Sequence, residues 1–180
     1  ALPPVVSILL AVFSVQGGET IAKGLFPVIG PTGTAAVRIG VSAIILLAIF
    51  RPPVRRFTST QWRAVVPYGI TIGVMNLLFY QALVRIPLGL AVTLEFVGPL
   101  GVAVAGSRRA LDVIWILLAA IGIVLIAPWQ AGSAVDPLGV ALALLTGSCW
   151  AAYIILGGRV SKLLTGGVPV ATGMSIAGLT

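Results

Sequence analysis

The sequence predicts an all-α membrane protein, built as a polytopic helix bundle. Of its 180 residues, 59% are hydrophobic and 8% are charged, and the mean hydropathy is +1.16. Soluble domains carry about 25% charged residues, so this chain has too little polar surface to face water on all sides. Its apolar residues also form runs of about 20, the length that a helix needs to cross about 30 Å of hydrocarbon. Both observations favour a chain that crosses a bilayer several times.

Seven apolar runs can be recognised along the chain. They cover about residues 4–24, 33–50, 64–84, 88–106, 113–128 and 138–157, and the seventh begins near residue 168. Turn-forming residues separate them at Gly30–Gly33, Arg51–Pro53, Ile86–Gly89, Asp136-Pro137 and Gly166-Gly167. In lipid only helices and closed barrels satisfy every backbone polar group. The ten-residue alternation typical of barrels is absent from the sequence, so the runs are predicted to be helices.

The order of the runs predicts two units. Residues 1–128 hold five spans, and residues 129–180 hold an outer loop, a sixth helix and the start of a seventh. Shifting the chain by 134 positions aligns residues 9–11 with residues 143–145. Because five is odd, a repeat that starts at the sixth span would enter the membrane upside down, as in many secondary transporters. The sequence lacks an initiator Met and stops in an apolar stretch, so we expect it to be a piece of a longer protein.

Basic residues predict the orientation. With a cytoplasmic N-terminus, the inside loops hold eight Lys and Arg residues and the outside ends hold two, Lys23 and Arg85, in agreement with the positive-inside rule. The eight are Arg51, Arg55, Arg56, Arg63, Arg108, Arg109, Arg159 and Lys162. A net charge of +7 would indicate a nucleic-acid partner only if these cations shared one solvated face. They lie in short clusters between apolar runs, so we expect a lipid bilayer and no nucleic-acid partner.

Polar residues inside the spans are the candidate binding residues, because ionisable groups are costly in a membrane and often mark functional sites there. The candidates for substrate or proton binding are Gln16, Glu19, Lys23, Arg38, Asn76, Tyr80 and Glu95. Gly98 and Pro99 follow Glu95 closely and predict a helix break. Such a break can free carbonyl groups to line a cavity, or it can be no more than a kink.

The depths of these residues predict that several lie together. At about 1.5 Å per helical residue, Glu19 and Arg38 lie about 8 Å from the outer surface. Asn76 and Glu95 lie about 12 Å from the turn that joins their helices, so we expect them to be level with each other. The bilayer midplane is about 15 Å deep. Four helices therefore place polar groups in one layer, with Glu95 as the strongest candidate.

Structural roles remain open for the same residues. Lys23 can extend to the outer interface, with Glu19 four residues before it as its partner. Arg38 and Glu95 can form a structural ion pair inside the bundle. Asn76 can hold two helices together through a hydrogen bond worth about 1 kcal/mol.

The composition argues against catalytic and metal chemistry. The chain has no histidine and a single cysteine, Cys149, which excludes disulfide frameworks and metal sites built from His and Cys. Paired carboxylates and a Gly-rich phosphate loop are also absent from the sequence, so we expect no enzyme, catalytic residue, metal or cofactor. Cys149, Trp150 and Tyr153 are interpreted as packing or interface residues.

Several segments of the sequence resemble a known family. The most specific is residues 87–100, PLGLAVTLEFVGPL, followed by Ser107-Arg108-Arg109. Gln16-Gly17-Gly18, Met75-Asn76 and Cys149-Trp150-Ala151 also fit. Through these segments the chain resembles the EamA-type drug/metabolite transporter superfamily, and within it the threonine and homoserine exporter group.

The resemblance implies ten helices in two inverted five-helix EamA repeats, of which this chain holds the first repeat and the start of the second. It also implies export of small neutral amino acids, such as threonine and homoserine, from the bacterial cytoplasm through the inner membrane by proton antiport. The partners would then be the amino acid, protons and lipid, and a homodimer stays open. An exporter of another metabolite or drug, or a membrane scaffold subunit that transports nothing, are the alternatives.

A zwitterionic substrate would need one contact of each charge and a partner for its hydroxyl group. Glu95 is expected to meet the ammonium group, and Arg38 or Lys23 the carboxylate. The hydroxyl contact would come from one of three residues: Asn76, Tyr80 or Gln16. A carboxyl group that is partly removed from water favours its protonated form, so Glu95 could exchange a proton for substrate.

Overall fold

All regular elements in the described part of the chain are helical, which confirms the predicted all-α class. The computed structural model describes Val6, Phe13 and residues 17–18, 21–22, 24–107, 110–126 and 136–180. Four helices are long and apolar enough to cross a membrane: Phe26–Phe50, Ser59–Arg85, Leu88–Gly106 and Pro137–Val160. The polytopic membrane architecture predicted from composition is therefore confirmed.

The helices begin and end close to the predicted apolar runs. In chain order they are α2 (Phe26–Phe50), the 3-10 turn η1 (Val54–Arg56), α3 (Ser59–Arg85), α4 (Leu88–Glu95), α5 (Val97–Gly106), α6 (Ala110–Ile126), α7 (Pro137–Val160) and α8 (Val168–Ala177). The predicted run at 88–106 is α4 followed by α5. The predicted run at 4–24 lies mostly outside the described residues.

The turn predicted at Gly30–Gly33 is reduced to a kink at a single residue. Gly30 has a φ of 70° and a ψ of 171° inside α2, a conformation that glycine adopts without the penalty of a Cβ atom. Pro31 follows and needs no N–H donor at the start of the straight part of the helix. The Thr34 hydroxyl donates to the Gly30 carbonyl over 2.7 Å. One residue thus suffices for the change of direction, and α2 starts at Phe26.

Local hydrogen bonds set the ends of α3 and α7. Thr58 and Gln61 form a reciprocal capping box at the start of α3. Asp136 caps α7 by accepting from the Leu138 N–H, and it pairs with Arg85 at the end of α3 over 3.0 Å. The bond from Arg85, followed by that from the Leu138 N–H, holds the pKa of Asp136 below its usual range. These contacts join the outer ends predicted for the two helices.

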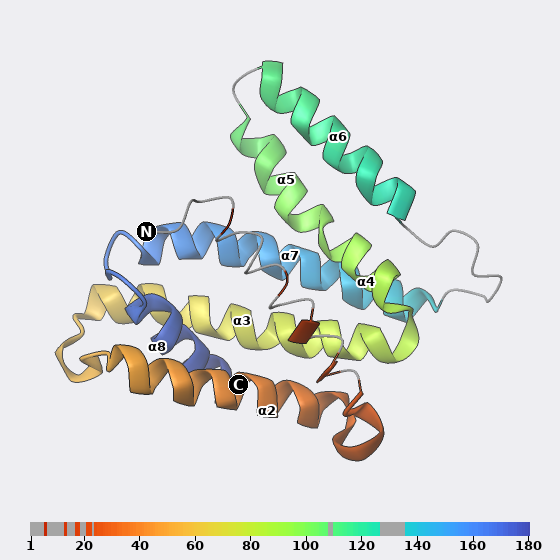
Figure 1. Cartoon of the computed structure of the whole chain (residues 1–180). Coiled ribbons are helices and arrows are strands. Elements are labelled where there is room, and N and C mark those ends of the chain that lie inside the picture. Colours follow the sequence, from red (N-terminus) through yellow and green to blue (C-terminus); the bar gives the residue numbers. More distant parts are fainter. Residues whose placement is uncertain are drawn as a thin grey trace.

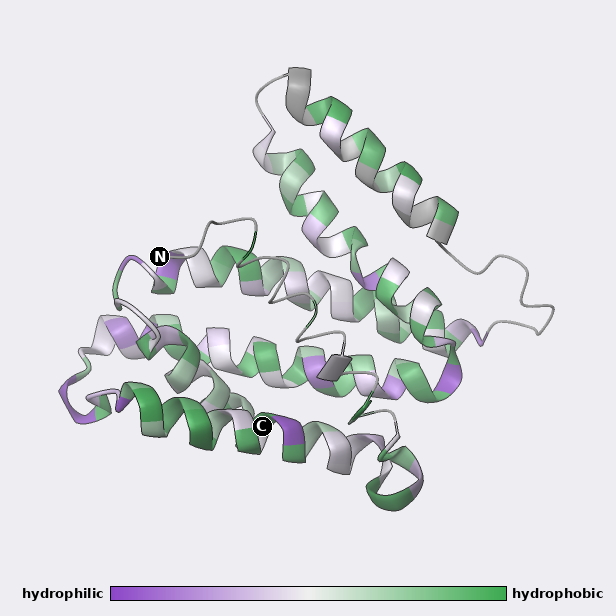
Figure 2. Ribbon diagram, in the orientation of Figure 1, coloured by the Kyte–Doolittle hydropathy of each residue, from purple (hydrophilic) through white to green (hydrophobic). Residues whose placement is uncertain are grey.

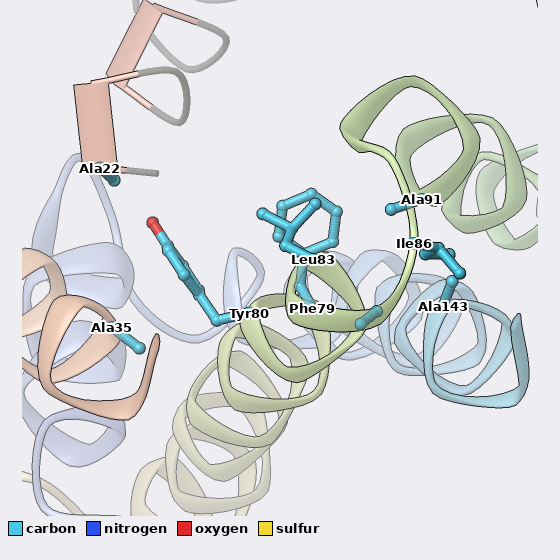
Figure 3. Close-up of a cluster of buried hydrophobic side chains, with 9 residues drawn as sticks. Ala22, Ala35, Phe79, Tyr80, Leu83, Ile86, Ala91 and Ala143 are labelled. Carbon is cyan, nitrogen blue, oxygen red and sulfur yellow. The ribbon is translucent and has the colours of Figure 1, made fainter. Parts of the chain in front are cut away.

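The bundle is organised around the pair of α3 and α7. Figure 1 shows α7 beside α3, with α8 crossing α2 and α3, α4 and α5 against α7, and α6 beside α5. One apolar cluster joins α3 to α4 and α7 and includes Phe79, Leu83, Ile86, Ala91 and Ala143 (Figure 3). A second cluster joins α2, α3 and α8 around Ile39, Tyr68 and Ile72. Together the clusters fix the positions of the helices that carry the polar candidates.

Small residues allow α8 to approach α3 closely. A Cβ atom added at Gly69 would lie 2.6 Å from Cβ of Ile176, and one added at Gly73 would lie 3.0 Å from the Ala177 carbonyl oxygen. On α8, a Cβ atom at Gly173 would lie 2.6 Å from the Tyr68 ring. These distances leave no room for larger side chains. The small residues therefore act as a helix-packing motif of the kind found in membrane bundles.

Candidate functional site

A cavity of about 310 Å³ lies inside the bundle and collects polar residues from three helices. Arg38 comes from α2, Asn76 from α3 and Glu95 from α4. The other lining residues come from α2, α3, α7 and α8: Ile39, Ser42, Tyr68, Ile72, Met75, Trp150, Tyr153, Val170 and Met174. The volume lies at the lower end of the range of about 300–1,000 Å³ for small-molecule sites. One site thus brings together a cation, an anion and an amide.

Glu95 is the last residue of α4 and borders the break between α4 and α5. Its Oε2 atom is shielded from solvent. Pro99, four residues later, has no N–H group and so cannot donate the usual helical hydrogen bond to the main-chain carbonyl of Glu95. The helix is interrupted at Phe96, one residue after Glu95. The break therefore coincides with the acidic residue of the cavity.

The break rests directly on the backbone of α7. A Cβ atom added at Gly98 would overlap the carbonyl oxygen of Gly147 and lie 3.0 Å from its Cα atom. Conversely, a Cβ atom added at Gly147 would lie 2.7 Å from the Glu95 carbonyl oxygen. Beside this contact the rings of Phe96 and Trp150 meet edge to face, with centroids 5.1 Å apart. Gly98 itself lines a separate groove between α5 and α7, outside the polar cavity.

Arg38 forms a hydrogen bond with Tyr80, which lies outside the lining of the cavity. Nη1 of Arg38 donates to the Tyr80 hydroxyl oxygen over 3.0 Å. Tyr80 is completely buried and does not line the cavity. Its ring packs against Phe26, at a centroid distance of 5.6 Å, and its hydroxyl points towards the segment that carries Ala22 (Figure 3). Tyr80 therefore contacts the guanidinium group of Arg38 and lies outside the lining of this cavity, and a direct contact between Tyr80 and substrate stays a prediction.

Asn76 is anchored to its own helix. Its Nδ2 atom donates to the Ile72 carbonyl oxygen over 2.9 Å, and the side chain still lines the cavity. Asn76 and Glu95 border the same space, as expected from their equal distances to the turn between α3 and α4. An amide in this position has both a donor and an acceptor to offer a ligand.

Aromatic side chains form much of the remaining wall. The rings of Tyr68 and Tyr153 stack at a centroid distance of 5.2 Å and an interplanar angle of 21°, and Trp150 lines the cavity beside them. Tyr68 was not singled out from the sequence, and Trp150 and Tyr153 were interpreted as packing residues. The spacing of Trp150 and Tyr153 was a usable signal, because residues three apart share one helix face.

Three candidates lie outside the described residues: Gln16, Glu19 and Lys23. The described site therefore consists of Arg38, Asn76 and Glu95, with Tyr80 behind Arg38 and an aromatic wall. Groups of both charges thus border one partly open cavity, which is the chemistry that a small zwitterion would need.

Comparison with curated proteins gives relatives over nearly the whole chain. Over 177 residues, 98% of this chain, it is 45% identical to the threonine/homoserine exporter RhtA of Escherichia coli K12. It is 44% identical over the same length to the protein of that name from Salmonella typhimurium LT2. The chain covers 60% of the length of each of these relatives. Neither a family model nor a solved structure matches the chain.

Proposed function

We propose that this chain carries the substrate site of an inner-membrane exporter of small neutral amino acids, such as threonine and homoserine. The observation that carries the proposal is that Arg38 and Glu95 line one cavity between membrane-spanning helices. The exporters that are 44–45% identical to the chain supply independent support. The assignment of the site residues rests on which side chains line the cavity.

The chemistry of the cavity matches that of a free amino acid. In this proposal Glu95 binds the ammonium group, the guanidinium of Arg38 binds the carboxylate, and Asn76 binds the side-chain hydroxyl. Arginine suits the second role because its planar fork matches the geometry of a carboxylate. Tyr68, Trp150 and Tyr153 then limit the size of the substrate side chain.

Proton antiport is the proposed coupling. A carboxyl group can carry a proton in its neutral form and can bind an ammonium group in its ionised form. Substrate and proton would therefore compete for Glu95. That competition is the requirement for exchanging one for the other across the membrane.

The proposal also includes the orientation of the chain in the membrane and an inverted repeat of its helices. The described spans alternate in direction from α2 to α7, with α4 and α5 as one span (Figure 1). With a cytoplasmic N-terminus, the loops on the inside would carry most of the cations. Helix α7 would then be the first helix of an inverted second repeat.

Counterflow of labelled amino acids tests the function. Vesicles that contain the complete protein and excess unlabelled threonine are expected to accumulate labelled threonine and homoserine transiently, and vesicles without protein are not. Accumulation of a different metabolite or drug alone would replace the substrate assignment. Absence of counterflow for every compound, from a folded protein, would favour a scaffold subunit.

The Tyr80→Phe variant is expected to raise the KM for threonine by about tenfold or more and to leave the maximal rate nearly unchanged. A hydrogen bond to a charged group is worth about 1.5–3 kcal/mol, and this one orients Arg38 from outside the cavity. Initial rates of uptake in vesicles measure both constants. Phe26→Leu is the control, because it alters packing against the same ring and leaves the hydroxyl in place. Equal effects of the two variants would contradict a positioning role.

A further inference from the structure

One end of the bundle carries a dense group of exposed cations. At this end α2 stops, α3 starts and α7 stops (Figure 1). The side chain of Gln61 ties the segments together, since its Nε2 atom donates to the Leu163 carbonyl oxygen over 3.1 Å. The group, here called the basic cluster, consists of Arg51, Arg55, Arg56, Arg63, Arg159 and Lys162. Figure 2 shows this end as hydrophilic beside strongly apolar helices.

The charge of the basic cluster is not neutralised within the described residues. None of its six side chains pairs with a carboxylate in the part of the chain that the structure describes. At the opposite end, Arg85 pairs with Asp136 over 3.0 Å. The cluster therefore presents net positive charge to an external anion.

The loop between α2 and α3 holds two of these cations in a defined shape. A shallow surface pocket of about 270 Å³ is lined by residues 52–56, including both Arg55 and Arg56. Pro52 and Pro53 restrict the backbone here, and η1 places Arg55 and Arg56 in one turn. A guanidinium group binds phosphate through two parallel hydrogen bonds. Two such groups on a restrained turn are well suited to one phosphate group.

The surroundings place the cluster at the level of lipid headgroups. Trp62, 38% exposed, packs against Phe57 with a ring distance of 5.5 Å, and tryptophan favours the membrane interface. Next to the cluster, the last turns of α2 expose Ile44, Ile45 and Ile49. A ligand with a phosphate group and long apolar chains would satisfy both surfaces, whereas free phosphate would use only one.

We propose that the basic cluster, centred on Arg55 and Arg56, binds the phosphate headgroup of an anionic phospholipid whose acyl chains lie along α2. This site is separate from the polar cavity and does not depend on the transported substrate. Basic clusters beside membrane helices attract anionic lipid. The surface pocket lined by residues 52–56 adds a place for a phosphate group.

Native mass spectrometry of the complete protein tests the proposal. The protein is equilibrated with equal amounts of phosphatidylglycerol and phosphatidylcholine in detergent, and the ratio of bound lipids is measured. The wild type is expected to be enriched in phosphatidylglycerol. Each cation near an anionic surface changes apparent affinity by about fivefold, so R55Q/R56Q is expected to lower the enrichment by about tenfold or more. The Arg85→Gln variant, which removes an exposed cation at the other end, is the matched control.

Three results would overturn the proposal. One is an absence of enrichment in the wild type, and another is an equal loss in the Arg85→Gln control. The third is displacement of phosphatidylglycerol by glycerol 3-phosphate at similar concentration, which would assign the cluster to soluble phosphates. R55K/R56K keeps the charge but loses the planar guanidinium groups, so its enrichment is expected to lie between that of the wild type and that of R55Q/R56Q. A loss larger than that of R55Q/R56Q would mean that the loop had been distorted, and would also count against the lipid site.

Discussion

Replacing Glu95 with Gln is expected to abolish threonine efflux driven by a pH gradient. Gln is close to Glu in size and can still form hydrogen bonds, but it can neither release nor take up a proton. The lost charge also weakens the ammonium contact. A hydrogen bond to a charged group is worth about 1.5–3 kcal/mol, so affinity is expected to fall by about 10- to 150-fold. Efflux from vesicles with an imposed pH gradient measures the first effect, and substrate competition measures the second.

Two comparisons make this prediction sharp. Glu95→Asp keeps the carboxyl group and is expected to retain gradient-driven efflux at a reduced rate. Counterflow at saturating substrate and equal pH on both sides requires no net proton movement, so Glu95→Gln is expected to lose less there than in gradient-driven efflux. Full gradient-driven efflux by Glu95→Gln would remove Glu95 from the mechanism.

Replacing Gly98 with Ala is expected to destabilise the bundle by about 3 kcal/mol or more, the upper part of the range for overpacked sites. The added Cβ atom would overlap the carbonyl oxygen of Gly147. The atoms that the added Cβ meets are backbone atoms of Gly147, so a side-chain rotation cannot relieve the overlap. Titration of the folded protein with a denaturing detergent, followed by circular dichroism, measures the change in unfolding free energy.

Gly101→Ala is the matched control on the same helix. A Cβ atom at Gly101 meets nothing within 4 Å, and alanine favours a helix over glycine by about 1 kcal/mol. This variant is therefore expected to be as stable as the wild type or slightly more stable. If Gly98→Ala and Gly101→Ala behaved alike, the close contact between the α4–α5 break and α7 would be incorrect.

The helices were predictable because lipid imposes a simple rule. A span must be apolar and of about 20 residues, and the turns between spans carry Gly, Pro and charge. The kink in α2 shows the limit of that rule. Gly30-Pro31 has the composition of a turn, but a single glycine with positive φ bends the helix without ending it. Sequence alone does not say how many residues will leave the helical conformation.

The part of the site that follows from the depth of each residue along its helix was predictable from the sequence. Asn76 and Glu95 border one cavity because they lie equally far from the turn between their helices. The role of Tyr80 was not predictable, since only the packing of α2 on α3 reveals whether its hydroxyl faces the cavity or Arg38. The aromatic wall likewise depends on which faces of α3 and α7 meet. The helical spacing of residues in the sequence predicts which of them share one face of a helix. The packing of the helices decides what that face contacts.

The contact between Gly98 and Gly147 has a mechanical consequence. The two backbones meet there without side chains between them, so a tilt of α7 about this contact would leave the contact itself in place. Trp150, three residues from Gly147, has a lever arm of about 4.5 Å, and the end of α7 has one of about 20 Å. A tilt of about 10° would thus move Trp150 by less than about 1 Å and the end of α7 by about 3.5 Å. Tyr153, six residues from Gly147, would move by about 1.6 Å, so the part of α7 that lines the polar cavity would be displaced less than the end of the helix.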